Sequence, residues 1–353
     1  MSEAALDARI SLTRGTLQVD VSLAAARGEV IGILGPNGGG KTSTVLALAG
    51  VLPLEEGHVV VSGTTWETAG GPRRLPEQRS VGLMLADALL FPHLRAIDNV
   101  AYGPRSRGVP ARAARTRARQ ELARVGLGDL VDARPSELSS GQAARVALAR
   151  ALAADPDLFL LDEPLSALDP ETRARTRSEL ARRLRDYGGV TVLVTHDPLD
   201  ALTLADRLVF VEAGAVTQVG TPSEVLREPR TPYVATVVGL NLYAAQADSH
   251  EVLTLAGGTP LIVGESPLGQ VWAAVSPHAV VLHRERPEGS SRNVWAMRVT
   301  EVTLRGQSAR VSLTEPLELI AEVTLASVAA LGIQVGSHLW ASVKATEVST
   351  YPR

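Results

Sequence analysis

Residues 35–42, GPNGGGKT, decide the fold of this chain. The preceding residues 28–34, GEVIGIL, are apolar and partly β-branched, which predicts a short buried strand, and residues 41–49 predict a helix. In this strand–loop–helix order, backbone N–H groups of the loop and of the helix N-terminus converge on phosphate. The predicted phosphate-binding residues are Gly35, Pro36, Asn37, Gly38, Gly39, Gly40, Lys41, Thr42 and Ser43.

Lysine is rare in this sequence. Only Lys41 and Lys344 are lysines among the 35 Lys and Arg residues. A retained ammonium suits a site that needs a compact point charge rather than a planar guanidinium. We therefore expect Lys41 to bridge the β- and γ-phosphates of a bound ligand and the Thr42 hydroxyl to bind Mg²⁺.

The composition sets the limits for these predictions. A length of 353 residues with 45% hydrophobic residues indicates two domains, and a net charge of -3 gives no overall attraction to nucleic acid. The absence of cysteine excludes disulfides and thiolate metal sites. The N-terminal MSEAALDARI is too polar for a signal peptide, and no apolar run reaches the roughly 20 residues of a spanning helix. We expect a cytosolic chain that can dock on a membrane protein.

Two further apolar segments end in polar residues. Residues 157–164, DLFLLDEP, and 190–197, VTVLVTHD, are typical of parallel strands whose carboxyl ends carry chemistry. Asp162 is placed to hold the metal, and Glu163 to polarise an attacking water. The alternative is a carboxylate pair that caps the turn before Pro164.

The arginine-rich residues 105–124 are helical in period. We interpret them as a solvated helix face with Leu122 and Val125 turned inward. The alternative, an RNA-binding patch, is disfavoured because no aromatic residues interleave the arginines.

The ordered motifs resemble the ATP-binding-cassette (ABC) family. After the phosphate loop come LSSGQAARVALARAL at residues 138–152, similar to the LSGGQ signature, then the carboxylate motif, LSALD at 165–169, and His196 within THD. This resemblance covers about residues 28–220 and implies a head-to-tail homodimer that holds ATP between one chain's phosphate loop and the other's signature. It assigns the signature role to Ser139, Ser140, Gly141 and Gln142.

The same resemblance assigns two further roles. His196 would contact the γ-phosphate and hold Glu163 in line, although a lone histidine at a strand end is often structural. Asp169 would connect the two sites across the dimer.

Two positions depart from the family pattern. In VGLMLADALLFPHL, residues 81–94, Ala86 stands where the family has the glutamine of the Q-loop. A methyl group cannot ligate Mg²⁺, so we expect weakened coupling to transport; Asp87 could substitute through a water or be a plain loop carboxylate. The aromatic residue that usually stacks on adenine is also missing, and Arg14 either stacks through its guanidinium plane or is a solvated strand residue.

After about residue 240, β-rich segments alternate with Gly, Pro and Ser turns. We predict an α/β P-loop ABC domain over 1–238, with a helical subdomain at about 86–155, and a small all-β, OB-like barrel domain over 239–353 with its core at about 291–353. Residues 271–280, VWAAVSPHAV, echo residues 339–348, LWASVKATEV, which suggests paired strands in the barrel.

This layout resembles importer ATPases, which bind a permease around the segment that matches residues 90–94, LFPHL. Residues 292–351 resemble the domain that molybdate-transport ATPases share with small molybdate-binding proteins. That resemblance implies an oxyanion site at Lys344, Ser327, Ser342 and Arg292, although Lys344 could be an exposed strand residue.

The expected function is therefore that of an ATP-hydrolysing, energy-coupling subunit of a molybdate importer. Sulfate, ferric iron, polyamine or sugar are alternative substrates, and a slow ATP-dependent regulatory switch is an alternative class. The expected partners are a second copy, permease subunits and, through them, an extracytoplasmic binding protein. This places the chain at the cytoplasmic face of the membrane.

Overall fold

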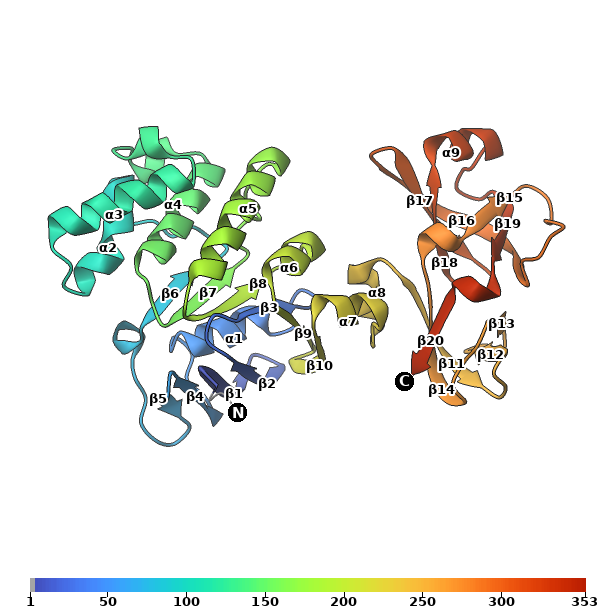
Figure 1. Cartoon of the computed structure of the whole chain (residues 1–353), viewed down its shortest axis with the longest axis horizontal. Helices are drawn as coiled ribbons and strands as arrows, with labels where there is room; N and C mark the ends of the chain where they lie inside the picture. Colours follow the sequence, from blue (N-terminus) through green and yellow to red (C-terminus); the bar gives the residue numbers. More distant parts are fainter. Residues whose placement is uncertain (1–3) are drawn as a thin grey trace. The chain divides into compact units, whose positions relative to one another are not determined.

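The computed structural model describes residues 4–353 and divides into two compact units (Figure 1). The first extends to Ser223 and the second covers Glu224–Arg353. The boundary predicted from the sequence was placed after residue 238. The intervening residues form two short helices, α7 (Pro222–Arg227) and α8 (Pro232–Val238).

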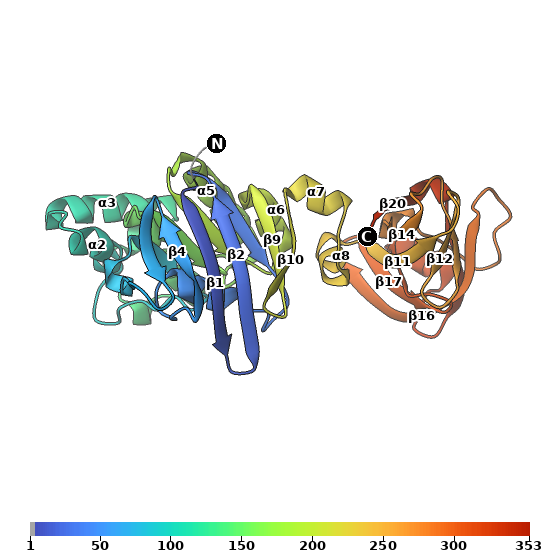
Figure 2. The ribbon, with the colours of Figure 1, turned by 90° about the horizontal axis from the view of Figure 1, so that it is seen from below.

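A ten-stranded sheet organises the first unit, in the order β5-β4-β1-β2-β10-β9-β3-β8-β7-β6. Figure 2 shows β4, β1 and β2 side by side in it. Strands β9, β3, β8, β7 and β6 run parallel, whereas β1, β2, β4 and β5 pair antiparallel. The strands are β1 (Leu6–Arg14), β2 (Leu17–Ala25), β3 (Val30–Leu34), β4 (Glu56–Val61), β5 (Thr64–Thr68), β6 (Val81–Met84), β7 (Leu158–Asp162), β8 (Val190–Val194), β9 (Arg207–Glu212) and β10 (Ala215–Gly220).

The parallel strands position the site. Every residue of β3, β7 and β8 is buried, as expected for strands covered on both faces. The phosphate loop follows β3, the two carboxylates follow or end β7, and His196 follows β8. Because the three strands are neighbours and parallel, these segments meet at one edge of the sheet.

The helices of this unit fall into two groups. Helices α1 (Lys41–Leu48), α5 (Pro170–Asp186) and α6 (Pro198–Leu204) follow the parallel strands. Helices α2 (Ala96–Ser106), α3 (Ala111–Arg124) and α4 (Ser140–Ala153) pack against one another, as Figure 1 shows. Short 3₁₀ turns lie at η1 (Pro76–Gln78), η2 (Gly128–Leu130) and η3 (Pro135–Glu137).

The arginine-rich segment differs from the predicted single helix. Leu122 and Val125 are buried as predicted, but α2 ends at Ser106 and α3 starts at Ala111. Gly108 has a φ of 85°, and Pro110 precedes α3, so the backbone cannot continue as a helix through this turn.

The second unit contains two five-stranded antiparallel sheets, ordered β13-β12-β11-β14-β20 and β15-β19-β16-β17-β18. Apolar residues of both sheets, such as Val271, Val299 and Val311, form one core, which confirms the predicted all-β class. The elements are β11 (Asn241–Ala247), β12 (Val252–Leu255), β13 (Pro260–Ile262), β14 (Gly269–Val275), η4 (Pro277–Ala279), β15 (Val281–His283), β16 (Asn293–Arg305), β17 (Ser308–Thr314), β18 (Leu319–Thr324), α9 (Leu325–Leu331), β19 (His338–Val343), η5 (Ala345–Glu347) and β20 (Val348–Pro352).

The strands formed by the two echoed segments do not pair with each other, so the predicted strand pair was wrong. They are β14 and β19, which lie in different sheets. Each of these two strands is followed by a 3₁₀ turn and a second strand: β15 follows β14, and β20 follows β19. Each second strand pairs with the first strand of the other unit, so that β20 pairs with β14 and β15 pairs with β19. The shared pattern therefore marks a repeated strand–turn–strand unit rather than a strand pair.

None of the helices formed by residues 4–353 combines the length and the hydropathy that crossing a bilayer requires.

Candidate functional site

The phosphate loop is shaped by backbone contacts that exclude side chains. A Cβ on Gly35 would lie 2.0 Å from the Val211 carbonyl oxygen, and Gly40, directly before α1, has a φ of 104°. Both positions therefore require glycine. The Lys41 ammonium turns back onto the loop, where Nζ donates to the carbonyl oxygens of Gly35 at 2.7 Å and Pro36 at 2.9 Å.

Thr42 and Asp162 meet across the first turn of α1. The Thr42 hydroxyl donates to Asp162 Oδ2 at 2.9 Å. Burial raises the pKa of the Asp162 carboxyl, and the Thr42 hydrogen bond and the nearby Lys41 charge oppose this rise. Burial likewise lowers the pKa of Lys41, against the attraction of Glu163 and Asp162. A lysine and two carboxylates thus share one poorly solvated space.

Glu163 and His196 form the second pair of the site. Glu163 has a φ of 53°, and its N–H donates to the Val194 carbonyl at 2.9 Å, so the residue is fixed against the end of β8. Its Oε1 lies 2.8 Å from His196 Nδ1. Its Oε2 is buried and has no partner among the described residues. One carboxylate oxygen is therefore held by histidine, while the other is buried with no hydrogen-bond partner among the described residues.

The side chains of Asp162 and Glu163 do not cap the turn before Pro164, which was the alternative role. Asp162 bonds to Thr42, and Glu163 contacts His196. The Ser166 hydroxyl instead donates to the backbone carbonyl of Glu163 at 2.9 Å.

These groups line a cavity of about 500 Å³. Asn37 to Ser43 form its floor together with Asp162 and Glu163, and Ala86 also lines it. Arg14 and Leu17, from the ends of β1 and β2, line the remaining wall. Both positions that depart from the family pattern, Ala86 and Arg14, thus face the phosphate loop.

The signature residues occupy the start of α4 and do not line this cavity. The Ser139 hydroxyl accepts from the Gln142 N–H at 3.2 Å, and Gln142 Oε1 accepts from the Ser139 N–H at 2.9 Å. This reciprocal cap fixes Ser140 and Gly141 in the first turn with their N–H groups free of helical partners. Asp169 similarly caps α5, where its Oδ1 accepts from the Thr172 N–H at 3.0 Å, and this backbone hydrogen bond lowers the pKa of Asp169.

An ion-pair cluster that the sequence reasoning missed connects α5 with the segment after His196. Arg173 lies 3.0 Å from Asp197, which caps α6, and both Arg173 and Arg177 pair with the buried Asp200. The spacing of the two arginines, one helical turn apart, is the only sequence signal for this contact.

A second missed cluster supports the segment around residues 88–94. Arg150 of α4 donates to the carbonyl oxygens of Ala88 at 3.0 Å and Leu89 at 2.9 Å, and it lies over the Phe91 ring. The buried Asn99 accepts from the Phe91 N–H at 2.8 Å. Leu89 is 63% exposed and presents an apolar surface.

The four candidate oxyanion residues lie at separate positions in the second unit. Ser342 is buried and its hydroxyl lies 3.0 Å from His283 Nε2, a residue that sequence reasoning missed. The Thr324 hydroxyl, which caps α9, accepts from the Ser327 N–H at 3.1 Å and lies 2.9 Å from the Ser327 hydroxyl. Arg292 lies 3.6 Å from Glu251 and lines a cavity of about 360 Å³ that the other three do not line.

Two of these four residues are related by strand register. Asn293 pairs with Val343, so Arg292 and the exposed Lys344 flank the same end of this strand pair. Ser342 is buried within β19, whereas Lys344 follows the strand and is exposed.

Comparisons with known proteins agree with this arrangement. The sequence model of the ABC transporter family matches residues 19–166, and that of the TOBE domain matches residues 289–350. The molybdenum import ATP-binding protein ModC of Mycobacterium tuberculosis (strain CDC 1551 / Oshkosh) is 39% identical over 350 residues, which cover 95% of this chain and 94% of that protein. The chain belongs to the ABC transporter family, among its import ATP-binding proteins.

Other members are similar over most of their length. The Fe(3+) ions import ATP-binding protein FbpC 2 of Rhizobium meliloti is 35% identical, with 91% of this chain and 84% of that protein covered. The molybdate/tungstate import ATP-binding protein WtpC of Pyrococcus horikoshii is 30% identical, with 94% and 95% covered.

A solved structure with the same fold is the dimeric, post-hydrolysis state of the ATP-binding cassette MJ0796 bound to ADP and Pi. Its TM-score is 0.55 at 26% identity, with 62% of this chain and 98% of that chain covered. The predicted fold class is confirmed.

Proposed function

We propose that this chain is the ATP-hydrolysing, energy-coupling subunit of a molybdate importer. The observation that carries the proposal is the end-to-end similarity to a molybdenum import ATP-binding protein, in a chain whose cavity joins a phosphate loop to Asp162 and Glu163. The hydrolytic role is supported by the Glu163 carboxylate, whose second oxygen is buried and unpartnered.

Glu163 and His196 divide the work of hydrolysis. Glu163 Oε2 accepts a proton from the attacking water, and His196 holds Oε1 so that the carboxylate keeps its orientation. Lys41, once released from the Gly35 and Pro36 carbonyls, stabilises the negative charge of the β- and γ-phosphates. The glycine-rich loop contributes backbone N–H groups to the same phosphates.

The residues present fit Mg²⁺. The paired Thr42 hydroxyl and Asp162 carboxylate are hard oxygen donors. No cluster of three or more His, Asp or Glu ligands lies among residues 4–353. A few protein oxygens suit Mg²⁺, which completes its shell with water and substrate phosphates. When bound, the ion would neutralise charge on the phosphates.

A homodimer completes the site in this proposal. The start of α4 lies outside the chain's own phosphate-loop cavity, yet its capped first turn is suited to bind an anion through free N–H groups. We therefore place Ser139, Ser140, Gly141 and Gln142 against the γ-phosphate bound to the partner chain, with Asp169 linking the two sites.

The transport partners follow from the same proposal. The segment held by Arg150 and Asn99 offers Leu89 and Phe91 to permease subunits at the cytoplasmic face of the membrane. An extracytoplasmic binding protein would act through the permease. In the second unit, Lys344, Ser342, Ser327 and Arg292 are the residues proposed to meet molybdate, with the Arg292–Lys344 end of the strand pair supplying positive charge.

A slow ATP-dependent switch is the second candidate, and Ala86 is the observation that favours it. This residue lines the phosphate cavity with a methyl group that cannot ligate a metal. The intact Glu163–His196 pair favours the hydrolytic importer.

The test is molybdate uptake by vesicles that carry the assembled permease and this subunit. We expect ATP-dependent uptake of molybdate over sulfate, lost in Glu163→Gln. Uptake of another substrate alone would overturn the molybdate assignment, and ATP binding without any hydrolysis would favour the switch. Calorimetry of molybdate against sulfate on the full chain, with Lys344→Gln as the variant, tests the second unit separately.

A further inference from the structure

A second cavity, of about 640 Å³, is lined by α3 and by Arg183 of α5. Its charged lining residues are Arg112, Arg117, Arg124, Arg183 and Glu121. The proposed hydrolytic and signature residues do not line it. The arginine-rich helix thus lines an open depression in addition to its solvated face.

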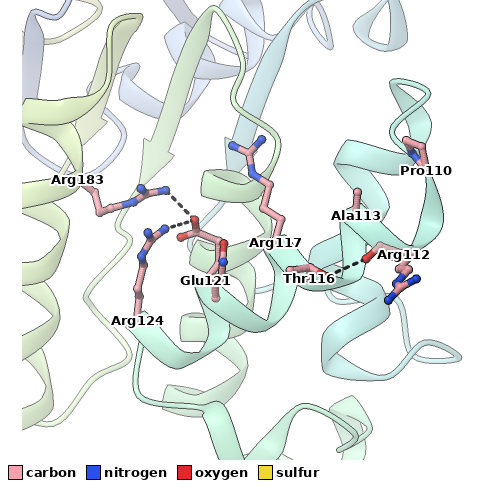
Figure 3. Close-up of a pocket in the computed structure, with 9 residues that line it drawn as sticks. Pro110, Arg112, Ala113, Thr116, Arg117, Glu121, Arg124 and Arg183 are labelled. Atoms are coloured by element: carbon pink, nitrogen blue, oxygen red, sulfur yellow. Dashed lines mark hydrogen bonds and ion pairs between the residues drawn. The ribbon is translucent and has the colours of Figure 1, made fainter.

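Glu121 is the buried centre of this pocket. Its side chain is 3% exposed, and Figure 3 shows Arg124 and Arg183 pointing toward it from α3 and α5. Its Oε1 accepts from Arg124 Nη1 at 2.6 Å and from Arg183 Nη2 at 2.8 Å. Both arginines thus bond to the same oxygen.

Two polar atoms of this cluster are buried without a partner among the described residues. They are Glu121 Oε2, an acceptor, and Arg183 Nε, a donor. Leaving such groups unpaired is costly, and native structures rarely do so without a bound water, ion or ligand. A single water occupies about 30 Å³ of liquid volume, so the cavity has room for a larger molecule.

The charge of the lining selects for anions. The lining carries four guanidinium groups and one carboxylate; Arg124 and Arg183 pair with Glu121, and Arg117 has only a 3.7 Å contact with Asp155, which is 68% exposed and does not line the cavity. Planar guanidinium groups match carboxylate and phosphate geometry. The unpartnered Glu121 Oε2 additionally requires an O–H or N–H donor.

We propose that this cavity binds a small polyanion that also carries a hydroxyl group, such as a hydroxy-polycarboxylate or a phosphorylated polyol. Its anionic groups contact Arg117 and Arg183, and its hydroxyl donates to Glu121 Oε2. The inference is independent of the proposed transport function.

The ligand requirement is tested by calorimetry on the full-length chain. The probes are citrate and tricarballylate, which is citrate without its hydroxyl, together with glycerol 3-phosphate. We expect citrate or glycerol 3-phosphate to bind, and the one that does identifies the carboxylate or the phosphate class. Tricarballylate should bind about tenfold more weakly than citrate if the carboxylate class is right. If neither citrate nor glycerol 3-phosphate binds, water fills the cavity and the proposal is overturned.

The position of the site is tested with a matched pair of variants. Arg117→Gln removes a lining guanidinium and should weaken binding about tenfold. Arg119→Gln removes the same charge from the exposed face of α3, outside the lining, and should change the affinity less than twofold. Equal losses would indicate non-specific attraction and contradict the proposal. If Arg117→Gln fails to fold, Arg117→Lys is the second variant. Lysine keeps the charge but lacks the planar guanidinium that donates two parallel hydrogen bonds, so binding should still weaken severalfold.

Discussion

Glu163 Oε1 lies 2.8 Å from His196 Nδ1, and the two residues follow the neighbouring parallel strands β7 and β8. The contact joins the two strand ends at the position where the Glu163 backbone N–H also donates to Val194. The second carboxylate oxygen is buried and has no partner among the described residues. In the proposed mechanism the two residues have different tasks: His196 positions the carboxylate, and Glu163 accepts the proton.

Replacing His196 by Ala should lower the steady-state ATPase rate about 100-fold, within the range that correct positioning of a general base provides. ATP affinity should change little, because His196 does not line the phosphate cavity. His196→Gln, which can still donate to Glu163, should recover part of the rate. An unchanged rate in His196→Ala would show that the contact is structural only.

Ala86→Gln should increase the transport achieved per ATP hydrolysed. The longer side chain would place an amide oxygen in the cavity beside Asp162, where the methyl group offers no ligand. The measurement is the ratio of molybdate uptake to ATPase rate in the assembled complex. Identical ratios in Ala86→Gln and the native complex would contradict the proposed loss of coupling at Ala86. A separate variant, Asp87→Asn in the native background, tests whether the Asp87 carboxylate substitutes for the glutamine through a water.

Arg79→Met should destabilise the first unit by about 3 kcal/mol, because it removes the buried cation of Glu67 and leaves only the Arg73 contact at 3.5 Å. Arg79 is fully buried, pairs with Glu67, and donates to the Ala47 and Leu48 carbonyls at the end of α1. Urea unfolding measures the change. The exposed Arg74→Met is the control and should stay within about 0.5 kcal/mol. A similar small change in both would contradict a structural role for the pair.

Asp162→Asn should make the nucleotide-free chain more stable at pH 7. Burial raises the pKa of Asp162, so folding disfavours its ionised form. The native chain therefore loses stability as the pH rises from the unfolded value of about 3.9 through the raised folded pKa. The urea midpoint of the variant should exceed the native one at pH 7, and the difference should shrink as the pH falls through that range. A lower midpoint at pH 7 would refute the account.

Sequence reasoning located the contiguous motifs well. The buried strands β3, β7 and β8 and the helix α1 lie within the segments predicted for them, since apolar strands and glycine-rich turns are local signals. Gly108 and Pro110 are also local signals for the break between α2 and α3, but the helical spacing of the arginines led us to predict one continuous helix.

Contacts between distant segments could not be predicted in this way. Arg150 of α4 donates to the backbone carbonyls of Ala88 and Leu89. Arg173 of α5 forms an ion pair with Asp200 of α6. Each depends on how elements pack, which a single sequence leaves open. The exchange of partners between β14 and β19 has the same origin, because strand period fixes which face is buried and not which strand lies alongside.

The central claim is that ATP is bound between two chains. Light scattering on Glu163→Gln with ATP and Mg²⁺ tests it most directly, because the variant should bind ATP without hydrolysing it. We predict the mass of two chains with ATP and of one chain without it, and loss of the dimer when Ser139 is also replaced by Arg. A single chain at saturating ATP would contradict the account.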